Sequence, residues 1–248
     1  MIYVRDIYQK LNQEYPFSSQ EDWDNAGLLC GSFEQEVTVC VTALDVTPET
    51  VAFAAGCDAQ LIISHHPVIF SGMKAVLHFS PVFQAIQHSI SILSAHTNFD
   101  KAETGTGAVL SELLGWKTHM LENELFRMGE LPQEKTVAEL ADELHIMLHT
   151  PVAYVLGEKT VKKIAVCTGA GGSEITRAAA AGADCYITGE MKYHEFLDAK
   201  AMGLGVAAAG HFETEDIAMQ VLNQRMQQWF PQVRWVKYTP EPPIQWSR

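Results

Sequence analysis

Short apolar runs alternate with amphipathic segments along most of the chain. Six runs rich in aliphatic residues predict buried strands at residues 37–44, 61–63, 90–95, 164–168, 185–188 and 204–209. Apolar residues at helical spacing, or helix-start signals, predict helices at 4–15, 47–56, 81–88, 109–114, 137–148 and 174–181. This alternation predicts an α/β fold, in which mostly parallel or mixed sheets are flanked by helices.

The second half of the chain repeats the order of elements in the first half. In both halves a helix ends in a Gly-x-Asp sequence, at 56–58 and at 182–184, shortly before the next strand. We therefore predict an internal duplication that gives two related α/β halves, with a site in the cleft between them. The expected domains are 1–120 and 121–248. Different strand orders in the two halves would contradict the duplication.

Histidines and carboxylates follow the predicted strands, and parallel strands bring their carboxyl ends to one edge of a sheet. These residues are Asp45, His65, His66, His96, Asp100, Glu190, His211 and Glu215. His211 and Glu215 are four residues apart, so they share one face if a helix begins there. Imidazole and carboxylate groups without cysteine are typical ligands of zinc, iron or manganese. Taken alone, however, adjacent histidines are more often one packed and one solvated side chain.

The candidate ligands are numerous enough for two divalent ions. Three histidines and two carboxylates, one of which bridges the ions, form a reasonable minimal set. Two ions about 3.5–4 Å apart can hold and deprotonate a water molecule for attack on a polarised centre. A structural zinc site is usually closed by four protein ligands, which often include cysteine. The ligand types in this chain therefore favour an open site.

Three further features have both a structural and a functional interpretation. In the turn at Trp23-Asp24-Asn25, Trp23 is expected to pack against the core, while Asp24 and Asn25 either shape the turn or contact a substrate. The glycine-rich loop at 169–173 either forms a tight turn between a strand and a helix or cradles a phosphate on its amides. Lys192 is well placed to meet an anion, although solvation on the surface explains it as well.

Composition restricts the functional classes. The chain has 248 residues, of which 47% are hydrophobic and 19% charged, as in ordinary globular proteins. The formal net charge of −13, without a run of lysine or arginine, argues against a protein that grips a nucleic-acid backbone. Five cysteines without Cys-x-x-Cys spacing are expected to be reduced residues of a cytoplasmic protein. The N-terminus is too polar to begin a signal peptide, and the apolar runs are too short for a membrane span.

Five sequence blocks together resemble a known family. They are Trp23-Asp24-Asn25-x-Gly27-Leu28, Ile63-Ser64-His65-His66-Pro67-x-Ile69-Phe70, His96-Thr97-Asn98-Phe99-Asp100, Thr188-Gly189-Glu190-Met191-Lys192-Tyr193-His194 and Gly210-His211-Phe212-Glu213-Thr214-Glu215. The blocks run in the same order from residue 23 to residue 215, which covers nearly the whole chain. They resemble the dinuclear-metal-centre hexameric protein family, whose members are often named GTP cyclohydrolase 1 type 2 homologues.

The resemblance implies a ring-like homohexamer of two-domain subunits, each with two divalent metal ions (zinc, iron or manganese). The implied metal ligands are His65, His66, Asp100, His211 and Glu215. The resemblance places His96, Asp45 and Glu190 close by, as supporting or substrate-facing groups. We expect catalytic roles for Glu190 and His96, and supporting or substrate-facing roles for Asp45, Asn98 and Lys192. The family name suggests opening of the imidazole ring of GTP. Hydrolysis of a phosphate ester or an amide is chemically reasonable at the same centre.

Three functional hypotheses follow. The first is a metal-dependent hydrolase of a small, nucleotide-like substrate, in which Glu190 or His96 moves protons. The second is a non-catalytic metal-handling or regulatory oligomer that uses the same ligands. The third is an oligomeric scaffold or nucleic-acid ring, which the acidic composition disfavours. An open site that holds water favours the first hypothesis over the second.

Overall fold

A computed structural model describes residues 1–122, 124–242 and 244 of the chain, which form two compact units. Unit 1 consists of Met1–Ala102 and Met219–Glu241, and unit 2 is built mainly from Glu103–Ala218. The sequence placed the boundary near residue 120. The chain instead enters unit 2 before helix α5 (Thr106–Leu113), because Leu110 of this helix belongs to the core of the second sheet.

Unit 1 contains a five-stranded sheet in the order β1-β4-β3-β2-β11. The strands are β1 (Gly27–Cys30), β2 (Val39–Ala43), β3 (Leu61–Ser64), β4 (Ser91–Ser94) and β11 (Arg234–Lys237). Strands β2, β3, β4 and β11 are parallel, and β1 is antiparallel to β4. The helices of unit 1 are α1 (Val4–Glu14), η1 (Phe17–Ser19), α2 (Pro48–Gly56), α3 (Pro81–Gln87), α4 (Thr97–Asp100) and, from Met219 on, α9 (His211–Trp229).

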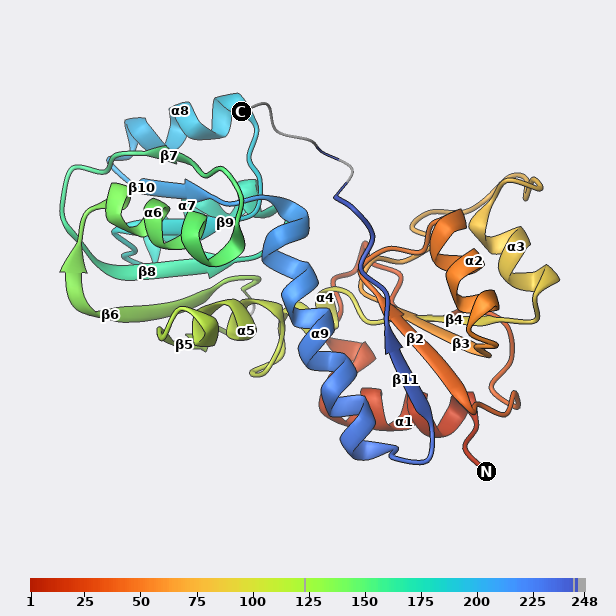
Figure 1. Cartoon of the computed structure of the whole chain (residues 1–248). Helices are drawn as coiled ribbons and strands as arrows, with labels where there is room; N and C mark the ends of the chain where they lie inside the picture. Colours follow the sequence, from red (N-terminus) through yellow and green to blue (C-terminus); the bar gives the residue numbers. More distant parts are fainter. Residues whose placement is uncertain (123, 243, 245–248) are drawn as a thin grey trace. The chain divides into compact units, whose positions relative to one another are not determined.

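The sheet of unit 1 sends alternate side chains to its two faces, as the strand repeat of two residues requires. Val39 and Val41 belong to the core that also contains Val51 of α2 and Ala85 of α3. On β2, Thr42 accepts a hydrogen bond of 2.8 Å from the side chain of Asn223 in α9 (His211–Trp229). In Figure 1, α2 and α3 lie together on one side of this sheet and α1 on the other. Both faces of the strands are therefore covered.

Unit 2 contains a six-stranded sheet in the order β5-β6-β8-β9-β10-β7. The strands are β5 (Lys117–Met120), β6 (Arg127–Lys135), β7 (Ala153–Val155), β8 (Val161–Cys167), β9 (Cys185–Thr188) and β10 (Gly205–Ala208). Strands β8, β9 and β10 are parallel, and β5, β6 and β7 each run antiparallel to a neighbour. Besides α5 and the start of α9, its helices are α6 (Val137–Leu148), η2 (Gly171–Glu174), α7 (Ile175–Ala180) and α8 (Tyr193–Ala201).

Two separate apolar cores cover the faces of the second sheet. Ile164 of β8 packs in the core that contains Leu140 of α6. The next residue, Ala165, packs in the core that contains Ala178 of α7 and Ala199 of α8. A strand with helices on both sides is apolar at nearly every position, which is why the part of β8 from Ile164 to Cys167 is a continuous apolar run. Figure 1 shows α6 and α8 beside this sheet.

The two units share one topology. In unit 1 the chain runs helix α1, then β1, and then the parallel strands β2, β3 and β4, with β1 antiparallel to β4. In unit 2 it runs helix α6, then β7, and then the parallel strands β8, β9 and β10, with β7 antiparallel to β10. The spatial orders β1-β4-β3-β2 and β7-β10-β9-β8 therefore correspond strand by strand. The prediction of two related α/β halves is confirmed.

Other features of the described residues agree with the composition. All five cysteines are free thiols. Burial raises the pKa of the thiols of Cys40 and Cys185 well above the ordinary value, so both remain protonated near neutral pH. None of the described helices is long and apolar enough to cross a membrane.

Candidate metal centre

Three histidines of unit 1 meet at the carboxyl edge of its sheet. His65 and His66 follow β3, and His96 follows the neighbouring parallel strand β4. One potential ligand atom of each lies within 4.8 Å of those of the other two. The ring centroids are 5.0 Å apart for His65 and His66, 5.0 Å for His65 and His96, and 5.6 Å for His66 and His96. The sequence prediction that strand ends bring these side chains together holds for this trio.

The Nδ1 atom of each of these histidines faces an oxygen atom. Nδ1 of His65 lies 2.9 Å from the carbonyl oxygen of Ala95. The corresponding distances are 2.8 Å from His66 to Oδ1 of Asp45 and 2.7 Å from His96 to Oδ1 of Asp24. Carbonyl and carboxylate oxygens only accept hydrogen bonds, so Nδ1 carries the proton and Nε2 carries the lone pair. This is the tautomer in which metal-binding histidines are usually held.

Main-chain hydrogen bonds hold the two adjacent histidines at the end of β3. The amide of His66 donates to the carbonyl of Leu44 at 3.0 Å. The hydroxyl of Ser94 donates to the carbonyl of His65 at 2.7 Å, and that of Ser64 donates to the carbonyl of His66 at 2.8 Å. Pro67 then prevents the ladder from continuing, since it has no amide hydrogen. Both rings can therefore lie at the same edge, although they are neighbours in sequence.

Asp100 adds a carboxylate to this group. It lies in α4, the short helix that begins directly after His96. Its Oδ1 atom is 3.5 Å from Nε2 of His65, and its side chain is mostly buried. An imidazole nitrogen and a carboxylate oxygen at this distance offer a cation two ligand types that suit zinc, iron or manganese.

Asp24 is the functional side chain whose role sequence reasoning left open. It accepts hydrogen bonds from His96 and from both the amide and the hydroxyl of Thr97, and its side chain is buried. Burial alone would raise the pKa of Asp24, but the hydrogen bonds from His96 and Thr97 outweigh it and lower the pKa to about 2. The pairing joins residues 72 positions apart, so no local sequence signal could have revealed it.

Among the described contacts, none joins the side chain of Asn98 or Lys192 to the side chain of a candidate metal ligand. The buried side chain of Asn98 donates to the carbonyl of Tyr15 at 2.8 Å and accepts from the amide of His96 at 3.0 Å. It therefore supports the main chain of His96. Lys192 is exposed, and its amide donates to the carboxylate of Glu195 in the first turn of α8.

Unit 2 carries a second group of ligand candidates at the same edge of its own sheet. His211 and Glu215 lie in the first turns of α9, directly after β10, and Nε2 of His211 is 3.1 Å from Oε2 of Glu215. Glu190 follows β9, and its Oε1 atom lies 3.1 Å from Nδ1 of His211. A helix does begin at His211, so the four-residue spacing places His211 and Glu215 on one face. The Nδ1 atom of this histidine, like those in unit 1, faces an oxygen acceptor.

Gly169 lies against these two side chains, and no other residue type fits there. Its φ is +64°, and a Cβ atom at this position would lie 2.0 Å from Oε1 of Glu215 and 3.1 Å from Nε2 of His211. Its carbonyl accepts hydrogen bonds from the amides of Gly189 (3.0 Å) and Glu190 (2.9 Å). Of the two interpretations of the glycine-rich loop, the tight turn accounts for these contacts.

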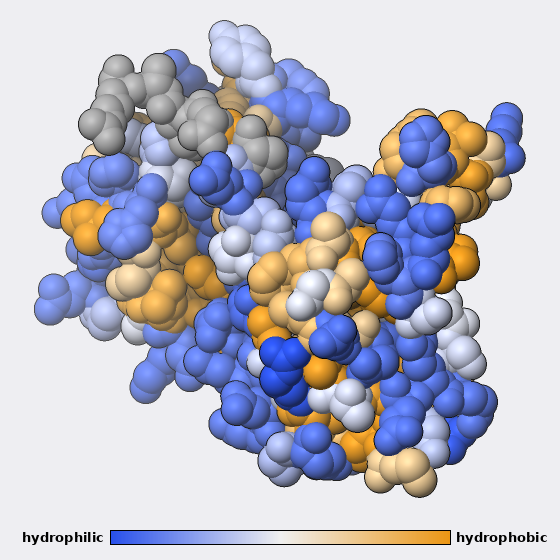
Figure 2. Space-filling view, turned by 45° about the vertical axis from the view of Figure 1, so that its right-hand side comes forward, coloured by the Kyte–Doolittle hydropathy of each residue, from blue (hydrophilic) through white to orange (hydrophobic). Residues whose placement is uncertain are grey.

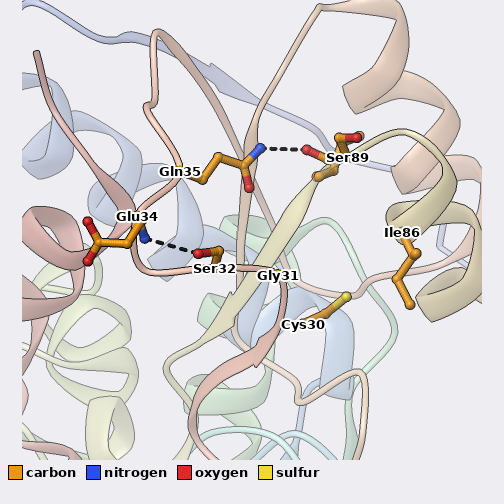
Figure 3. A pocket seen from close by; sticks show the side chains of 8 residues that line it. Cys30, Gly31, Ser32, Glu34, Gln35, Ile86 and Ser89 are labelled. Carbon is orange, nitrogen blue, oxygen red and sulfur yellow. Dashed lines mark hydrogen bonds between the residues drawn. The ribbon is translucent and has the colours of Figure 1, made fainter.

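Unit 1 also has a pocket whose lining includes none of these histidines (Figure 3). Its volume is about 340 Å³, and its lining includes Cys30, Glu34 and Gln35. The side chain of Gln35 donates to the carbonyl of Ser89 across it, at 2.5 Å. Burial raises the pKa of Cys30, so this thiol is a poor nucleophile near neutral pH.

Comparison with known proteins identifies the family of this chain. The sequence model of Duf34/NIF3 (NGG1p interacting factor 3) matches residues 2–242. The chain belongs to the Duf34/NIF3 family. Relatives of this Duf34/NIF3 chain include the GTP cyclohydrolase 1 type 2 homolog of Campylobacter jejuni, 33% identical over 225 residues (88% of this chain, 90% of that protein). The GTP cyclohydrolase 1 type 2 of Helicobacter pylori is 31% identical over 224 residues (87% of this chain, 88% of that protein).

Solved structures share the whole fold of this Duf34/NIF3 chain. The crystal structure of Staphylococcus aureus protein SA1388 matches with a TM-score of 0.91 and 27% identity, and the match covers 99% of each chain. A Bacillus cereus protein related to NIF3 matches with a TM-score of 0.90 and 22% identity, over 100% of this chain and 99% of that one. The family resemblance read from the five sequence blocks is thereby confirmed.

Proposed function

We propose that this Duf34/NIF3 chain binds two divalent metal ions and uses them to hydrolyse a small, nucleotide-like substrate. The proposed ligands are His65, His66, Asp100, His211 and Glu215. The observation that carries the proposal is the shared state of the three imidazoles. Each has Nδ1 within hydrogen-bond distance of an oxygen atom, which leaves Nε2 as the atom that would bind a metal ion; in His211, Nε2 also lies 3.1 Å from Oε2 of Glu215, another of the proposed ligands.

The donor set fits a divalent transition-metal ion. Imidazole nitrogens and carboxylate oxygens, without thiolates, suit zinc, iron and manganese. Asp45 and Glu190 support the histidines in the way that carboxylates outside a metal's own ligands usually do, by accepting Nδ1–H. The carboxylates of Asp100 and Glu215 supply the negative charge that offsets the charge of the cations.

Bound at these ligands, two ions would supply a nucleophile at neutral pH and stabilise the negative charge that develops in the substrate. The chain itself supplies proton transfer. The Nδ1–H group of His96 is held by Asp24, so the lone pair on Nε2 can take a proton while the carboxylate stabilises the resulting positive charge. Glu190, whose side chain is about half exposed (54%), can pass a proton to solvent.

The names of the relatives supply the first candidate substrate. The Campylobacter jejuni and Helicobacter pylori proteins are named for GTP cyclohydrolase 1 type 2. For this chain we therefore take GTP as the first substrate to test, with attack at C8 of the guanine ring and release of formate. Phosphate esters and amides are the next candidates, since the same centre stabilises charge on a phosphoryl or carbonyl oxygen. The family resemblance extends the proposal to a homohexamer that works in the cytoplasm.

The test combines metal content with turnover. Wild-type protein is loaded in turn with zinc, manganese and iron, and metal per chain is measured by elemental analysis. Each form is then incubated with GTP, phosphate esters and amides, and formate and phosphate release are followed. His66→Ala and Glu215→Ala are expected to bind at least one ion fewer per chain, to stay folded, and to lose turnover.

The control is His88→Ala, because His88 is an exposed residue at the end of α3. It should bind metal and turn over substrate like the wild type. Full metal content in both ligand variants would show that the ligand assignment is wrong. Full loading of the wild type without turnover of any substrate would reject the hydrolase and leave a metal-handling or regulatory protein.

A further inference from the structure

Three aromatic rings form a contiguous group beside the histidines of unit 1. The ring centroids of Trp23 and Phe70 are 5.8 Å apart, and they lie 6.1 Å and 6.2 Å from that of His96. Both outer rings meet the imidazole edge to face, at interplanar angles of 75° and 79°. We call Trp23, Phe70 and His96 the aromatic corner. Because His96 also contacts His65 and His66, the corner is continuous with the candidate metal ligands.

The two outer rings are exposed although they are large and apolar. Trp23 is 54% exposed and Phe70 is 53% exposed, whereas the side chain of His96 is 14% exposed. The expectation that Trp23 packs against the core is therefore wrong. Its turn lies at the sheet edge, where the ring meets the histidine cluster. Exposed aromatic surface beside a polar site is typical of ligand-binding sites, which combine apolar walls with a few placed polar groups.

Hydrogen bonds fix the corner from both sides. The side chain of Asn25 donates to the carbonyl of Ile69 at 2.6 Å, which ties the Trp23 turn to the loop that carries Phe70. Asp24 accepts from Nδ1 of His96 at 2.7 Å and from the amide of Asn25 at 2.7 Å. These hydrogen bonds thus fix the ring of His96 and the main chain next to Trp23 and Phe70.

Exposed rings of this kind offer stacking faces to a flat ring. An aromatic face binds another planar π-system by stacking, and it does so with little dependence on which base is offered. The corner carries no charged side chain of its own apart from the imidazole. It therefore complements the uncharged, planar part of a ligand and leaves anionic groups to other parts of the site.

We propose that Trp23 and Phe70 bind a heteroaromatic ring of the substrate, such as a nucleobase, by stacking, with the edge of that ring toward His96. This inference rests on the proposed function, because it assigns a substrate class to the same site. It makes Trp23 and Phe70 determinants of specificity, and it makes Asn25 a positioning residue for both.

Calorimetric binding to the full-length chain tests this inference, once with the protein as purified and once after zinc loading. The probes are guanosine 5′-monophosphate, adenosine 5′-monophosphate and ribose 5-phosphate, of which only the last lacks the ring. The wild type is expected to bind both nucleotides at least about tenfold more tightly than ribose 5-phosphate. Trp23→Ala and Phe70→Ala should each remove most of this preference, while Trp23→Phe should keep much of it.

The control is Phe79→Ala, because Phe79 is also exposed (62%) and its described ring contact is with His78. It should keep the full preference. Circular dichroism and metal content check that the variants remain folded and loaded. Equal affinity of the wild type for nucleotides and ribose 5-phosphate would overturn the proposal, as would an unchanged preference in both alanine variants.

Failure of this inference is distinguishable from failure of the proposed function. A wild type that loads metal and turns over substrate but shows no preference for a ring rejects the aromatic corner alone. A wild type that binds no metal but prefers nucleotides, and loses the preference with Trp23→Ala, rejects the metal centre and retains the corner.

Discussion

At the residue scale, the hydrogen-bond partners of Nδ1 decide the chemistry of the imidazoles. Three of the four partners are the carboxylates of Asp24, Asp45 and Glu190, and the fourth is the carbonyl of Ala95. The sequence predicted Asp45 and Glu190, because both follow strands directly. It left Asp24 open, because this residue lies in a turn far from its partner in sequence.

Asp24 is expected to make stability depend on acid pH. Its pKa is about 2 in the folded protein and 3.8 ordinarily, so the carboxylate stabilises the fold by about 2 kcal/mol above pH 4. That contribution is lost as pH falls from about 4 to 2. Asp24→Asn should therefore lower the free energy of unfolding by about 2 kcal/mol at pH 7, and by about half as much at pH 3. Urea unfolding of metal-free protein at both pH values measures this.

Asp22→Asn is the matched control, because Asp22 is an exposed carboxylate two residues away. It should change stability little at either pH. A loss in Asp24→Asn that is the same at pH 7 and pH 3 would contradict the assigned pKa.

Gly169→Ala tests the close approach of the turn after β8 to the proposed ligands of unit 2. A Cβ atom there would overlap the carboxylate of Glu215 and must displace it, so metal content should fall by at least one ion per chain. Gly115→Ala is the control, because Gly115 has a similar φ of +71° and nothing within 4 Å of its would-be Cβ. Both variants should lose about 1–2 kcal/mol of stability from backbone strain. Elemental analysis and thermal unfolding distinguish the two effects, and equal metal content in both variants would contradict the role of Gly169.

At the scale of elements, hydrogen bonds of a threonine connect the start of α9 to the end of β8. The hydroxyl of Thr214 accepts from the amide of Gly169 at 3.1 Å and donates to the carbonyl of Gly210 at 2.9 Å. It thereby joins the first turn of the helix, which carries His211 and Glu215, to the end of β8.

Thr214→Val should lose both hydrogen bonds while it keeps the shape of the side chain. Because a buried amide loses its partner, we expect a loss of about 1–3 kcal/mol in the free energy of unfolding, together with weaker metal binding. Thr214→Ser keeps the hydroxyl and should retain metal affinity near the wild-type value. Chemical denaturation and metal titration of both variants test this, and equal metal affinity in the valine and serine variants would exclude an aligning role for the hydroxyl.

The strands that the sequence missed have physical reasons for being missed. The first antiparallel strand, β1, is only four residues long and follows directly on turn residues, so its pattern is too short to read. Strands β5 and β6 carry many polar side chains because they form one side of the second sheet, where burial is incomplete. Strand β11 contains Arg234 and Lys237, and tertiary pairing with β2 outweighs this weak local pattern.

The sequence predicted well the strands that are covered on both faces of a sheet and the helix that packs against such a face. The helix at Val137–Leu148 agrees at both ends with the periodicity, and the strand at Leu61–Ser64 agrees to within one residue. For the same reason the strand-end ligand candidates were found, since parallel topology fixes which ends meet. The partners of these ligands were found only where they too followed a strand.

At the scale of the whole molecule, the duplicated topology is the main result. A helix, an antiparallel strand and three parallel strands occur in the same order in both units. In both, ligand candidates follow the second and third parallel strands, as His66 and His96 do in unit 1 and Glu190 and His211 do in unit 2. The repeat therefore includes the positions of the ligand candidates as well as the fold.

The proposed homohexamer is testable by mass. Hydrophilic side chains cover most of the face in Figure 2, with apolar patches between them, and the net charge of −13 favours solubility of whatever assembly forms. Six chains of 27.5 kDa would give a particle of about 165 kDa. Sedimentation analysis at several protein concentrations should find this mass without a populated monomer. A monomer or dimer at micromolar concentration would reject the hexamer and leave the metal-centre proposal intact.

The path of the chain has a consequence for synthesis on the ribosome. Strand β11, which completes the sheet beside β2, is the last strand among the described residues, whereas the six described strands of unit 2 are all made once β10 has emerged. The unit that begins first is therefore finished last. A nascent chain must keep β2 uncovered on one edge until Arg234–Lys237 leaves the exit tunnel, and a premature stop after residue 229 would leave the sheet of unit 1 without β11 while the six strands of unit 2 are already made.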